Sequence, residues 1–222
     1  MPTLDRQGDV FVLDLGDTEN RFHPDWLASA NAALDKVADA DGAALVTAAT
    51  GKFFSNGLDL EWLLANGDKA MDYVNSVQEL FARVLELPMI TVAALQGHTF
   101  AAGAMLSLAH DFRVMRADRG FWCLPEVDIN IPFTPGMSAL IQARLPQPAM
   151  HEAMTTGRRY GGADALAAGI VDRAVAEDAV RATALDIAGA NTAKAGPTLG
   201  AIKARMYAPV LDTLRDKANP MG

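Results

Sequence analysis

One glutamate, Glu126, stands in apolar surroundings that could make its carboxyl group a proton-transfer catalyst. Large apolar side chains occupy the positions around it: Trp122, Leu124, Val127, Ile129, Ile131 and Phe133. Burial beside such groups disfavours the charged carboxylate and raises its pKa towards that of a useful general base. Pro125 restricts the backbone before Glu126 and helps to aim its side chain. The alternative is a surface glutamate at a strand end, because glutamate is seldom fully buried. For Asp128, two residues further on, we prefer a cap or an ion pair to a shared acid–base role.

A glycine-containing stretch, residues 96–111 (QGHTFAAGAMLSLAHD), offers a second kind of chemistry, the binding of negative charge by backbone groups. The apolar run Met89–Leu95 before it predicts a buried strand, and the residues after it suit a helix. Gly97 and Gly103 allow the backbone to turn tightly and to approach a neighbour or ligand closely. The start of such a helix presents free N–H groups and the positive end of the helix dipole. These suit a phosphate, or an oxygen that becomes negative during a reaction, although a purely structural turn would have the same pattern.

The other residue types that carry chemistry form no recognisable site. His98 and His110 have no cysteine, aspartate or glutamate at metal-ligand spacing, so no metal site is predicted. The one cysteine, Cys123, lies in an apolar run and is interpreted as a packed thiol. Ser55 and Ser107 lack the G-x-S-x-G signature of serine hydrolases. The phosphate-binding signatures G-x-x-x-x-G-K-[ST] and G-x-G-x-x-G are also absent, which disfavours an ATPase or a Rossmann dehydrogenase.

Composition sets the class of protein. The 222 residues are 50% hydrophobic with a mean hydropathy of +0.10, which supports one sizeable domain, with or without a small appendage. No nucleic-acid partner is expected, because the net charge is −8 and no basic run is present. No signal peptide is predicted, because the N-terminal residues include no basic region followed by an apolar one. No membrane segment is predicted, because polar residues and glycines interrupt the longest apolar zone, residues 87–109. The single cysteine fits a reducing compartment, and we expect a cytoplasmic protein.

Apolar periodicity predicts the elements that must position these residues. Strands are predicted at residues 10–15, 43–48, 89–95 and 112–115. Helices are predicted to open at His23, to cover 71–85 and, in the alanine-rich part after Pro148, to cover 149–155, 162–168, 177–190 and 197–215. The stretch Phe121–Ile131, which contains Glu126, is interpreted as a strand interrupted at Pro125. Strands that alternate with helices in this way predict an α/β fold.

Six segments together resemble the enoyl-CoA hydratase/isomerase family, whose fold is the crotonase fold. They are residues 51–60 (GKFFSNGLDL), 96–103 (QGHTFAAG), 108–114 (LAHDFRV), 124–127 (LPEV), and the pair 156–159 (TGRR) and 168–171 (AGIV). The first two are similar to the two glycine turns of the family, and the fourth is similar to its Pro-Glu catalytic strand. The resemblance extends over about residues 8 to 190, and the order and spacing of the segments carry it.

The resemblance implies the fold and the assembly. It implies an α/β spiral of ββα units with a helical C-terminal region. Residues 1–147 would form the spiral core with the acyl-CoA site, and residues 148–222 would serve oligomerisation and pocket closure. A homotrimer or hexamer is expected. No cofactor is expected beyond coenzyme A, which is part of the substrate thioester.

The resemblance also implies site residues. The backbone N–H groups of Leu58 and Ala102 would form an oxyanion hole for the thioester oxygen of an acyl-CoA, and Glu126 falls at the catalytic position. Residues expected to contact the substrate are Phe53, Asn56, Gly57, Gly103 and Phe133. Residues expected to contact the coenzyme A phosphates are Arg21 and Lys52, with Lys203 as a further candidate. For these three cations the alternative is a solvated surface charge.

The sequence departs from the family pattern at two places, and the first of them decides the expected reaction. Hydratases of the family use two glutamates to activate water, but the second position here is Met105. A single base can still take a proton from C2 or C4 and return it to the other carbon, so the expected enzyme is a Δ3,Δ2-enoyl-CoA isomerase. The alternatives are a hydratase or thioester hydrolase, and a non-catalytic acyl-CoA-binding subunit. The second departure is Ala101-Ala102 in place of two glycines, which is tolerable if the backbone there is helical.

Overall fold

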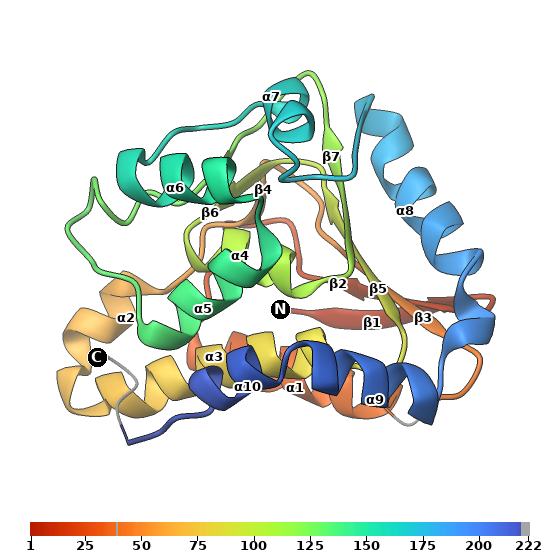
Figure 1. Ribbon diagram of the computed structural model, residues 1–222, viewed down its shortest axis with the longest axis horizontal. Coiled ribbons are helices and arrows are strands. Elements are labelled where there is room, and N and C mark those ends of the chain that lie inside the picture. Colours follow the sequence, from red (N-terminus) through yellow and green to blue (C-terminus); the bar gives the residue numbers. More distant parts are fainter. Residues whose placement is uncertain (39, 219–222) are drawn as a thin grey trace.

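The structure, a computed structural model, describes residues 1–38 and 40–218 and is built on a six-stranded sheet (Figure 1). Its strands lie in the order β1 (Thr3–Gln7), β2 (Val10–Asp14), β3 (Ala44–Ala48), β5 (Ile90–Leu95), β7 (Phe112–Arg116) and β9 (Arg173–Val175). β1 and β2 pair antiparallel, and every later pair is parallel. The four predicted strands are therefore confirmed. β1 and β9 escaped the sequence patterns because they are more exposed, and β9 is also shorter than the others.

A second, three-stranded parallel sheet stands beside the first and explains how the glycine turns are used. It consists of β4 (Phe53–Ser55), β6 (His98–Phe100) and β8 (Trp122–Cys123). Each strand follows a strand of the large sheet, in the pairs β3–β4, β5–β6 and β7–β8, and helices come next. The predicted passage from β5 through a glycine turn directly into a helix is thus corrected, because β6 lies between them. This repeat is the predicted spiral of ββα units.

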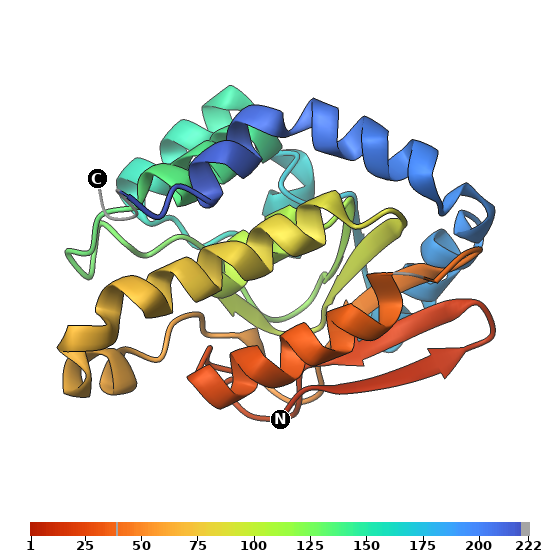
Figure 2. The same cartoon turned by 90° about the horizontal axis from the view of Figure 1, so that it is seen from below.

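Helices cover both faces of the large sheet (Figures 1 and 2). On one face α8 (Val180–Gly189) crosses β3, β5 and β7 and packs small and β-branched side chains against them. On the other face α1 (Pro24–Ala38) and α3 (Ala70–Glu86) enclose the main core, and α4 (Ala102–Ala109) is buried along its whole length. The other helical segments before α9 are α2 (Leu60–Ala65), η1 (Gly67–Lys69), α5 (Pro135–Arg144), α6 (Gln147–Thr156), α7 (Gly162–Ala167), η2 (Glu177–Ala179) and η3 (Thr192–Lys194).

The predicted helical C-terminal region is described up to residue 218. Its last predicted helix, residues 197–215, divides at Tyr207 into α9 (Pro197–Met206) and α10 (Ala208–Leu214). Pro209 near the start of α10 supplies no N–H, which explains the break. α10 packs against α3 and α5, and so closes the main core from the C-terminal side. The division of the chain at residue 147 stays a prediction.

Lys203 of α9 is buried, and its position corrects a sequence expectation. Its Nζ lies 3.0 Å from Asp111 Oδ2 and donates to the Met89 carbonyl at 3.2 Å. Asp111 also accepts hydrogen bonds from the backbone N–H and hydroxyl of Thr91. Burial lowers the pKa of the Lys203 ammonium, and the Asp111 carboxylate opposes that shift. A phosphate contact and a solvated surface charge are both wrong for Lys203. The buried side chain instead links α9 to Met89, just before β5, and to Asp111, just after α4.

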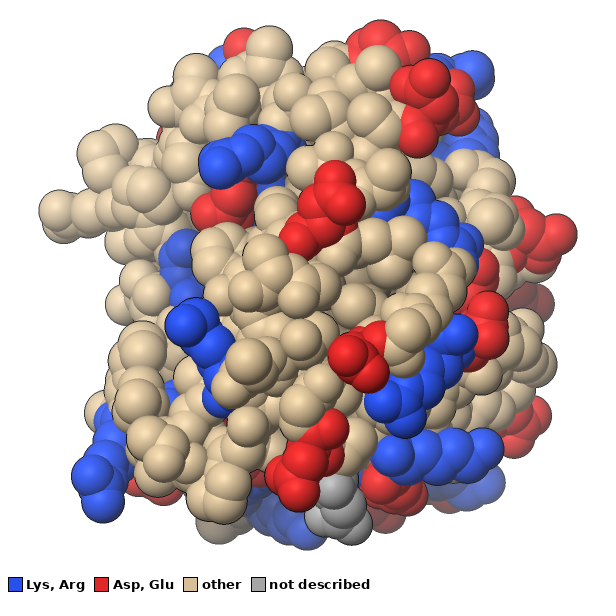
Figure 3. Space-filling model, turned by 90° about the vertical axis from the view of Figure 1, so that its right-hand side faces the viewer, with Lys and Arg blue, Asp and Glu red and all other residues tan. Residues whose placement is uncertain are grey.

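The surface carries charges of both signs. On the face shown in Figure 3, lysine and arginine side chains lie next to aspartates and glutamates in small groups. Uncharged surface separates one group from the next. A search of the described residues finds no helix that is long and apolar enough to cross a membrane.

Candidate active site

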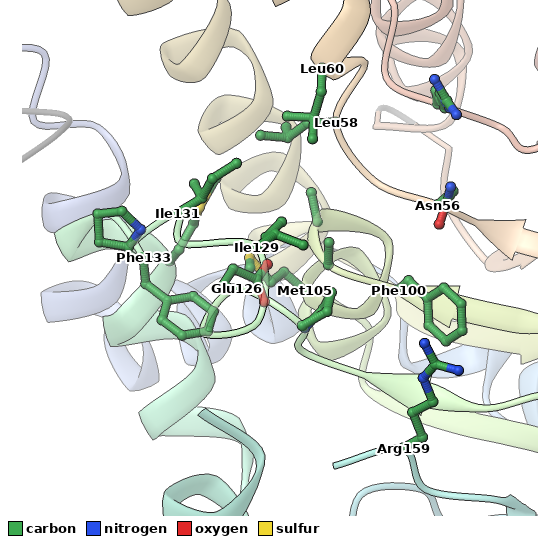
Figure 4. A pocket seen from close by; sticks show the side chains of 16 residues that line it. Asn56, Leu58, Leu60, Phe100, Met105, Glu126, Ile129, Ile131, Phe133 and Arg159 are labelled. Atoms are coloured by element: carbon green, nitrogen blue, oxygen red, sulfur yellow. The ribbon is translucent and has the colours of Figure 1, made fainter. Parts of the chain in front are cut away.

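A cavity of about 360 Å³ lies where the ends of the small sheet meet α4 and the segment after β8 (Figure 4). Three parts of the chain supply most of its wall: the β4–α2 turn, the start of α4, and residues 125–137. Arg21 and Arg159 come from two more distant segments. The lining side chains labelled in Figure 4 are Asn56, Leu58, Leu60, Phe100, Met105, Glu126, Ile129, Ile131, Phe133 and Arg159. The structure therefore brings together at one cavity six of the residues named from the sequence: Glu126, Leu58, Ala102, Asn56, Phe133 and Arg21.

A tight turn, and not a strand, aims Glu126 into the cavity. β8 ends at Cys123, and the backbone N–H groups of Asp128 and Ile129 then donate to the Pro125 carbonyl at 2.9 and 3.2 Å. The predicted strand over 121–131 is wrong beyond Cys123, because these bonds close the chain on itself. The turn separates the two carboxyl groups, since Glu126 is 6% exposed whereas Asp128 is exposed to solvent.

The Glu126 carboxyl group is poorly solvated. Among the described residues its Oε2 atom is buried without a hydrogen-bond partner. This desolvation raises the pKa of Glu126 to about 7, against a smaller lowering by its own backbone N–H. At neutral pH the group is therefore present both as carboxylate and as acid, which is the condition for taking a proton and returning it. The alternative of an exposed glutamate at a strand end is excluded.

The turn after β4 leaves one backbone amide free for a ligand. Asn56 N donates to the Glu19 carbonyl, Gly57 N to the Ser55 hydroxyl and Asp59 N to the Tyr73 hydroxyl, at 2.8, 3.1 and 2.9 Å. Between them, the N–H of Leu58 makes no hydrogen bond within the described part of the chain. Leu58 lines the cavity, so this donor lies at its wall.

A second free amide lies at the start of α4. Ala101 N donates to the Cys123 carbonyl at 3.1 Å, and Met105 N donates to Ala101 at 3.1 Å. Ala102 is the first residue of α4, so its N–H has no partner inside the helix, and it finds none elsewhere in residues 1–38 and 40–218. The positive end of the helix dipole adds to the attraction for negative charge. Ala102 N lies only 2.8 Å from the position that a Cβ would occupy on Gly57, so the two turns are in contact.

Ala101, immediately before this amide, has a conformation that alanine seldom adopts. Its φ is 50° and its ψ is −127°, outside the helical region. The expectation that a helical backbone makes Ala101 tolerable is therefore wrong for Ala101, although it is correct for Ala102. Such a conformation in a residue with a Cβ costs about 1–3 kcal/mol and persists only because the surrounding structure holds it.

Ala101→Gly is therefore expected to stabilise the protein. Relief of about 1–3 kcal/mol of strain exceeds the entropic cost of glycine, about 0.5–1 kcal/mol, so the net gain is about 1 kcal/mol. In a protein of this size that raises the melting temperature by about 2–4 °C in a thermal unfolding experiment. The matched control is Ala104→Gly, inside the helical part of α4, which is expected to lower the melting temperature. A lower melting temperature for Ala101→Gly would show that the backbone is unstrained.

Two glycines and one aromatic residue named from the sequence, Gly57, Gly103 and Phe53, do not line the cavity. Gly57 packs against Ala102, and a Cβ on Gly103 would meet the Ser55 carbonyl oxygen at 2.6 Å, so both allow the turns to touch. Phe53 is not part of the cavity wall, which corrects its expected substrate contact. Successive strand residues face opposite ways, so that Phe54 enters the core and Phe53 lies beside His98, with ring centroids 5.4 Å apart.

Lys52 also lies outside the cavity. Its Nζ is 5.3 Å from the centre of the Phe53 ring, and the residue lines a separate hollow together with Gln96, His98 and Arg119. The expected coenzyme A contact of Lys52 is therefore not made within the cavity. Conversely, sequence reasoning missed Arg159 as a lining residue, because nothing in the run TGRR distinguishes it from Arg158.

No cluster of three or more histidine, cysteine, aspartate or glutamate residues suited to a metal occurs among the described residues. The cavity itself brings together one carboxyl group, that of Glu126, and the free amides of Leu58 and Ala102. A desolvated carboxyl group that shares a cavity with two free amides suits an enzyme that moves a proton beside a carbonyl group. The carbonyl oxygen takes up negative charge in such a reaction. Comparison with known proteins assigns the chain to a family of such enzymes.

The model of the family described as enoyl-CoA hydratase/isomerase matches residues 5–219, and the chain belongs to this family. Enoyl-CoA delta isomerase 3 of Arabidopsis thaliana is 43% identical over 194 residues, which cover 82% of each protein. The relative named enoyl-CoA delta isomerase 2, peroxisomal, from the same plant is 42% identical and covers 78% of this chain and 77% of its own length. A solved enoyl-CoA isomerase of Mycobacterium tuberculosis is 28% identical with a TM-score of 0.89, covering 97% of this chain and 95% of that chain. These neighbours confirm the crotonase fold.

Proposed function

We propose that the protein is a Δ3,Δ2-enoyl-CoA isomerase, which moves the double bond of a 3-enoyl-CoA thioester to the 2-position. One observation carries the proposal: Glu126 is the only carboxyl group among the described residues that line the cavity, and it shares that cavity with the free amides of Leu58 and Ala102. The names of the relatives support the same reaction.

The reaction needs one base and one site for negative charge. The thioester oxygen accepts hydrogen bonds from the N–H groups of Leu58 and Ala102. The Glu126 carboxylate takes a proton from C2, and the electrons of the broken C–H bond delocalise through the carbonyl group to give a dienolate. The protonated Glu126 then returns the proton to C4, so that the double bond moves from C3–C4 to C2–C3. The two amides lower the barrier because they bind the dienolate oxygen more strongly than the neutral carbonyl.

Met105 favours isomerisation over hydration. It lines the cavity at the position where the family's hydratases carry a second glutamate, and it is 1% exposed. Its thioether neither takes up nor releases a proton, so a water molecule beside it would meet one base and no second carboxylate. The apolar side chains around Glu126 also keep the carboxyl group poorly solvated, which preserves its basicity.

Product analysis tests the proposal directly. Purified protein is incubated with a panel of 3-enoyl-CoA and 2-enoyl-CoA thioesters of different chain length and double-bond geometry, and products are followed by mass and by absorbance of the conjugated thioester. An isomerase converts the 3-enoyl substrates to conjugated products of equal mass. Addition of one water would show a hydratase, release of coenzyme A a thioester hydrolase, and binding without turnover a non-catalytic subunit.

The raised pKa of Glu126 predicts how activity depends on pH. The base acts as carboxylate, so kcat/KM is expected to rise with pH through about 7 and to level off above it. Below that value it falls about tenfold per pH unit, because the ionised fraction does. Initial rates from pH 5 to pH 9 measure this profile. A profile that is flat from pH 5 upwards would show that the carboxyl group has an ordinary pKa.

The remaining expectations are part of the same proposal. The protein would need no cofactor beyond the coenzyme A of its substrate, would assemble as a homotrimer or hexamer, and would act in the cytoplasm. Two of the Arabidopsis relatives are named as peroxisomal, so the compartment proposed for this chain differs from the one in their names. Sedimentation of the purified protein tests the assembly.

A further inference from the structure

The cavity has two chemically different ends. In Figure 4, Ile131 and Phe133 lie on one side of Glu126, and Phe100 and Arg159 lie on the other. Apolar side chains make up much of the cavity wall, among them Leu58, Leu60, Ile129, Ile131, Phe133 and Met137. The side with Phe100 and Arg159 contains a guanidinium group. An acyl-CoA has the same polarity, because its acyl chain is apolar and its negative charges lie on the phosphates of the coenzyme A moiety.

Arg158 and Arg159 are both exposed to solvent, but only Arg158 is held by ion pairs. Arg158 forms ion pairs with Glu152 at 3.0 Å and Asp164 at 3.4 Å, and its guanidinium lies over the Tyr160 ring. Arg159 has no ion pair or hydrogen bond to any described residue. Its guanidinium carbon lies 5.8 Å from the centre of the Phe100 ring at the wall of the cavity. The arrangement therefore leaves the donors of Arg159 free for a ligand.

The positive charge around Arg159 is not neutralised locally. Arg21, the other arginine of the cavity, pairs with Glu19 at 2.6 Å, whereas Lys52, Arg119 and Arg159 form no ion pair within the described residues. The pKa of the His98 imidazole is lowered, first by burial and then by the charges of Lys52, Arg159 and Arg119. Three unpaired cations in one region of a chain with a net charge of −8 create a local field that attracts an anion.

We propose that Arg159 binds a phosphate group of the coenzyme A moiety and so sets which end of the cavity receives the acyl chain. This inference rests on the proposed function for its substrate class. A guanidinium group suits the role because its planar donors match phosphate oxygens in pairs. The Phe100 ring beneath it restricts the side chain, so that less conformational freedom is lost when the phosphate binds.

Kinetics of Arg159→Gln test the proposal, with Arg158→Gln as the matched control. For a 3-enoyl-CoA, Arg159→Gln is expected to raise KM about tenfold, equivalent to about 1.4 kcal/mol, while kcat stays within about twofold. For the same acyl group on N-acetylcysteamine, which has no phosphate, the variant and the wild type are expected to have equal KM values. Arg159→Lys should recover part of the loss, because it keeps the charge without the paired donors. Arg158→Gln should change neither constant.

Direct binding separates this inference from the proposed function. Calorimetry with coenzyme A, dephospho-coenzyme A and pantetheine needs no turnover. Arg159→Gln is expected to weaken coenzyme A binding about tenfold and to leave pantetheine unchanged. An equal loss with dephospho-coenzyme A assigns the contact to the diphosphate, and no loss with it assigns the contact to the 3′-phosphate. Equal coenzyme A affinities for the wild type and a folded Arg159→Gln would overturn the inference. Absence of isomerisation by the wild type, with Arg159-dependent binding retained, would overturn only the proposed function.

Discussion

Glu126→Gln is expected to lower isomerase kcat about 10²–10⁴-fold, the range that a positioned acid–base group contributes. Glutamine has nearly the shape of glutamate but cannot accept the proton from C2 or return it to C4. No second carboxyl group among the described lining residues can replace it. Acyl-CoA binding should change little, because the amides of Leu58 and Ala102 and the apolar wall remain. Conversion of a 3-enoyl-CoA, followed by the absorbance of the conjugated product, measures the loss.

The matched control is Asp128→Asn, which removes the same charge two residues away. Asp128 is exposed to solvent, so this variant is expected to keep its activity. Turnover by Glu126→Gln within about tenfold of the wild type, with the protein folded, would remove Glu126 from the role of base and with it the proposed mechanism.

The same substitution is expected to stabilise the protein at high pH. The pKa of Glu126 is raised in the folded protein from 4.5 to about 7, so folding favours the protonated form. The stabilisation from that proton is complete below about pH 4.5 and is lost as pH rises through about 7. The loss amounts to on the order of 3 kcal/mol at pH 8. Glutamine carries no charge at either pH, so its advantage in free energy of unfolding should be larger at pH 8 than at pH 4. Denaturant titrations at the two pH values measure the difference.

Gly57→Ala has the second largest expected effect, a loss of about 10²–10³-fold in kcat, which is typical of losing one oxyanion donor. The new Cβ would lie 2.8 Å from Ala102 N, closer than real Cβ contacts allow, and 3.1 Å from the Phe100 carbonyl oxygen, tighter than most of them. Backbone atoms on both sides make this clash difficult to relieve. The turn that carries the Leu58 amide must therefore move away from the start of α4, and the two amides can no longer bind the same oxygen well.

Gly8→Ala is the control for strain alone. Gly8 and Gly57 both have positive φ, 61° and 80°, but a Cβ on Gly8 meets no atom within 4 Å. Both variants are expected to lose roughly 1–2 kcal/mol of stability from the unfavourable backbone conformation, and only Gly57→Ala should lose turnover. Wild-type kcat in a folded Gly57→Ala protein would mean that the contact between the two turns does not set the positions of the amides.

The fold could be predicted where the information is local. Long apolar segments such as those of β3, β5 and α3 have a clear period, which identifies them without knowledge of their partners. The two-residue strand β8 and the three-residue strands β4 and β6 have no such period. They form because the large sheet brings segments far apart in the chain into register, so they could be found only through the resemblance or in the structure.

For the site, the amino-acid sequence by itself determined that one carboxyl group with apolar neighbours and two glycine turns were present. The resemblance to the family predicted that Met105 stands where its hydratases carry a second glutamate. Only the tertiary structure decided that Glu126 points inward and Asp128 outward, that Lys203 is buried, and that Arg159 rather than Lys52 lies at the cavity. The reason is physical: residue type and spacing are properties of the local chain. Burial, charge pairing and pKa depend on which distant segments pack against a residue, and that is defined only when the chain has folded.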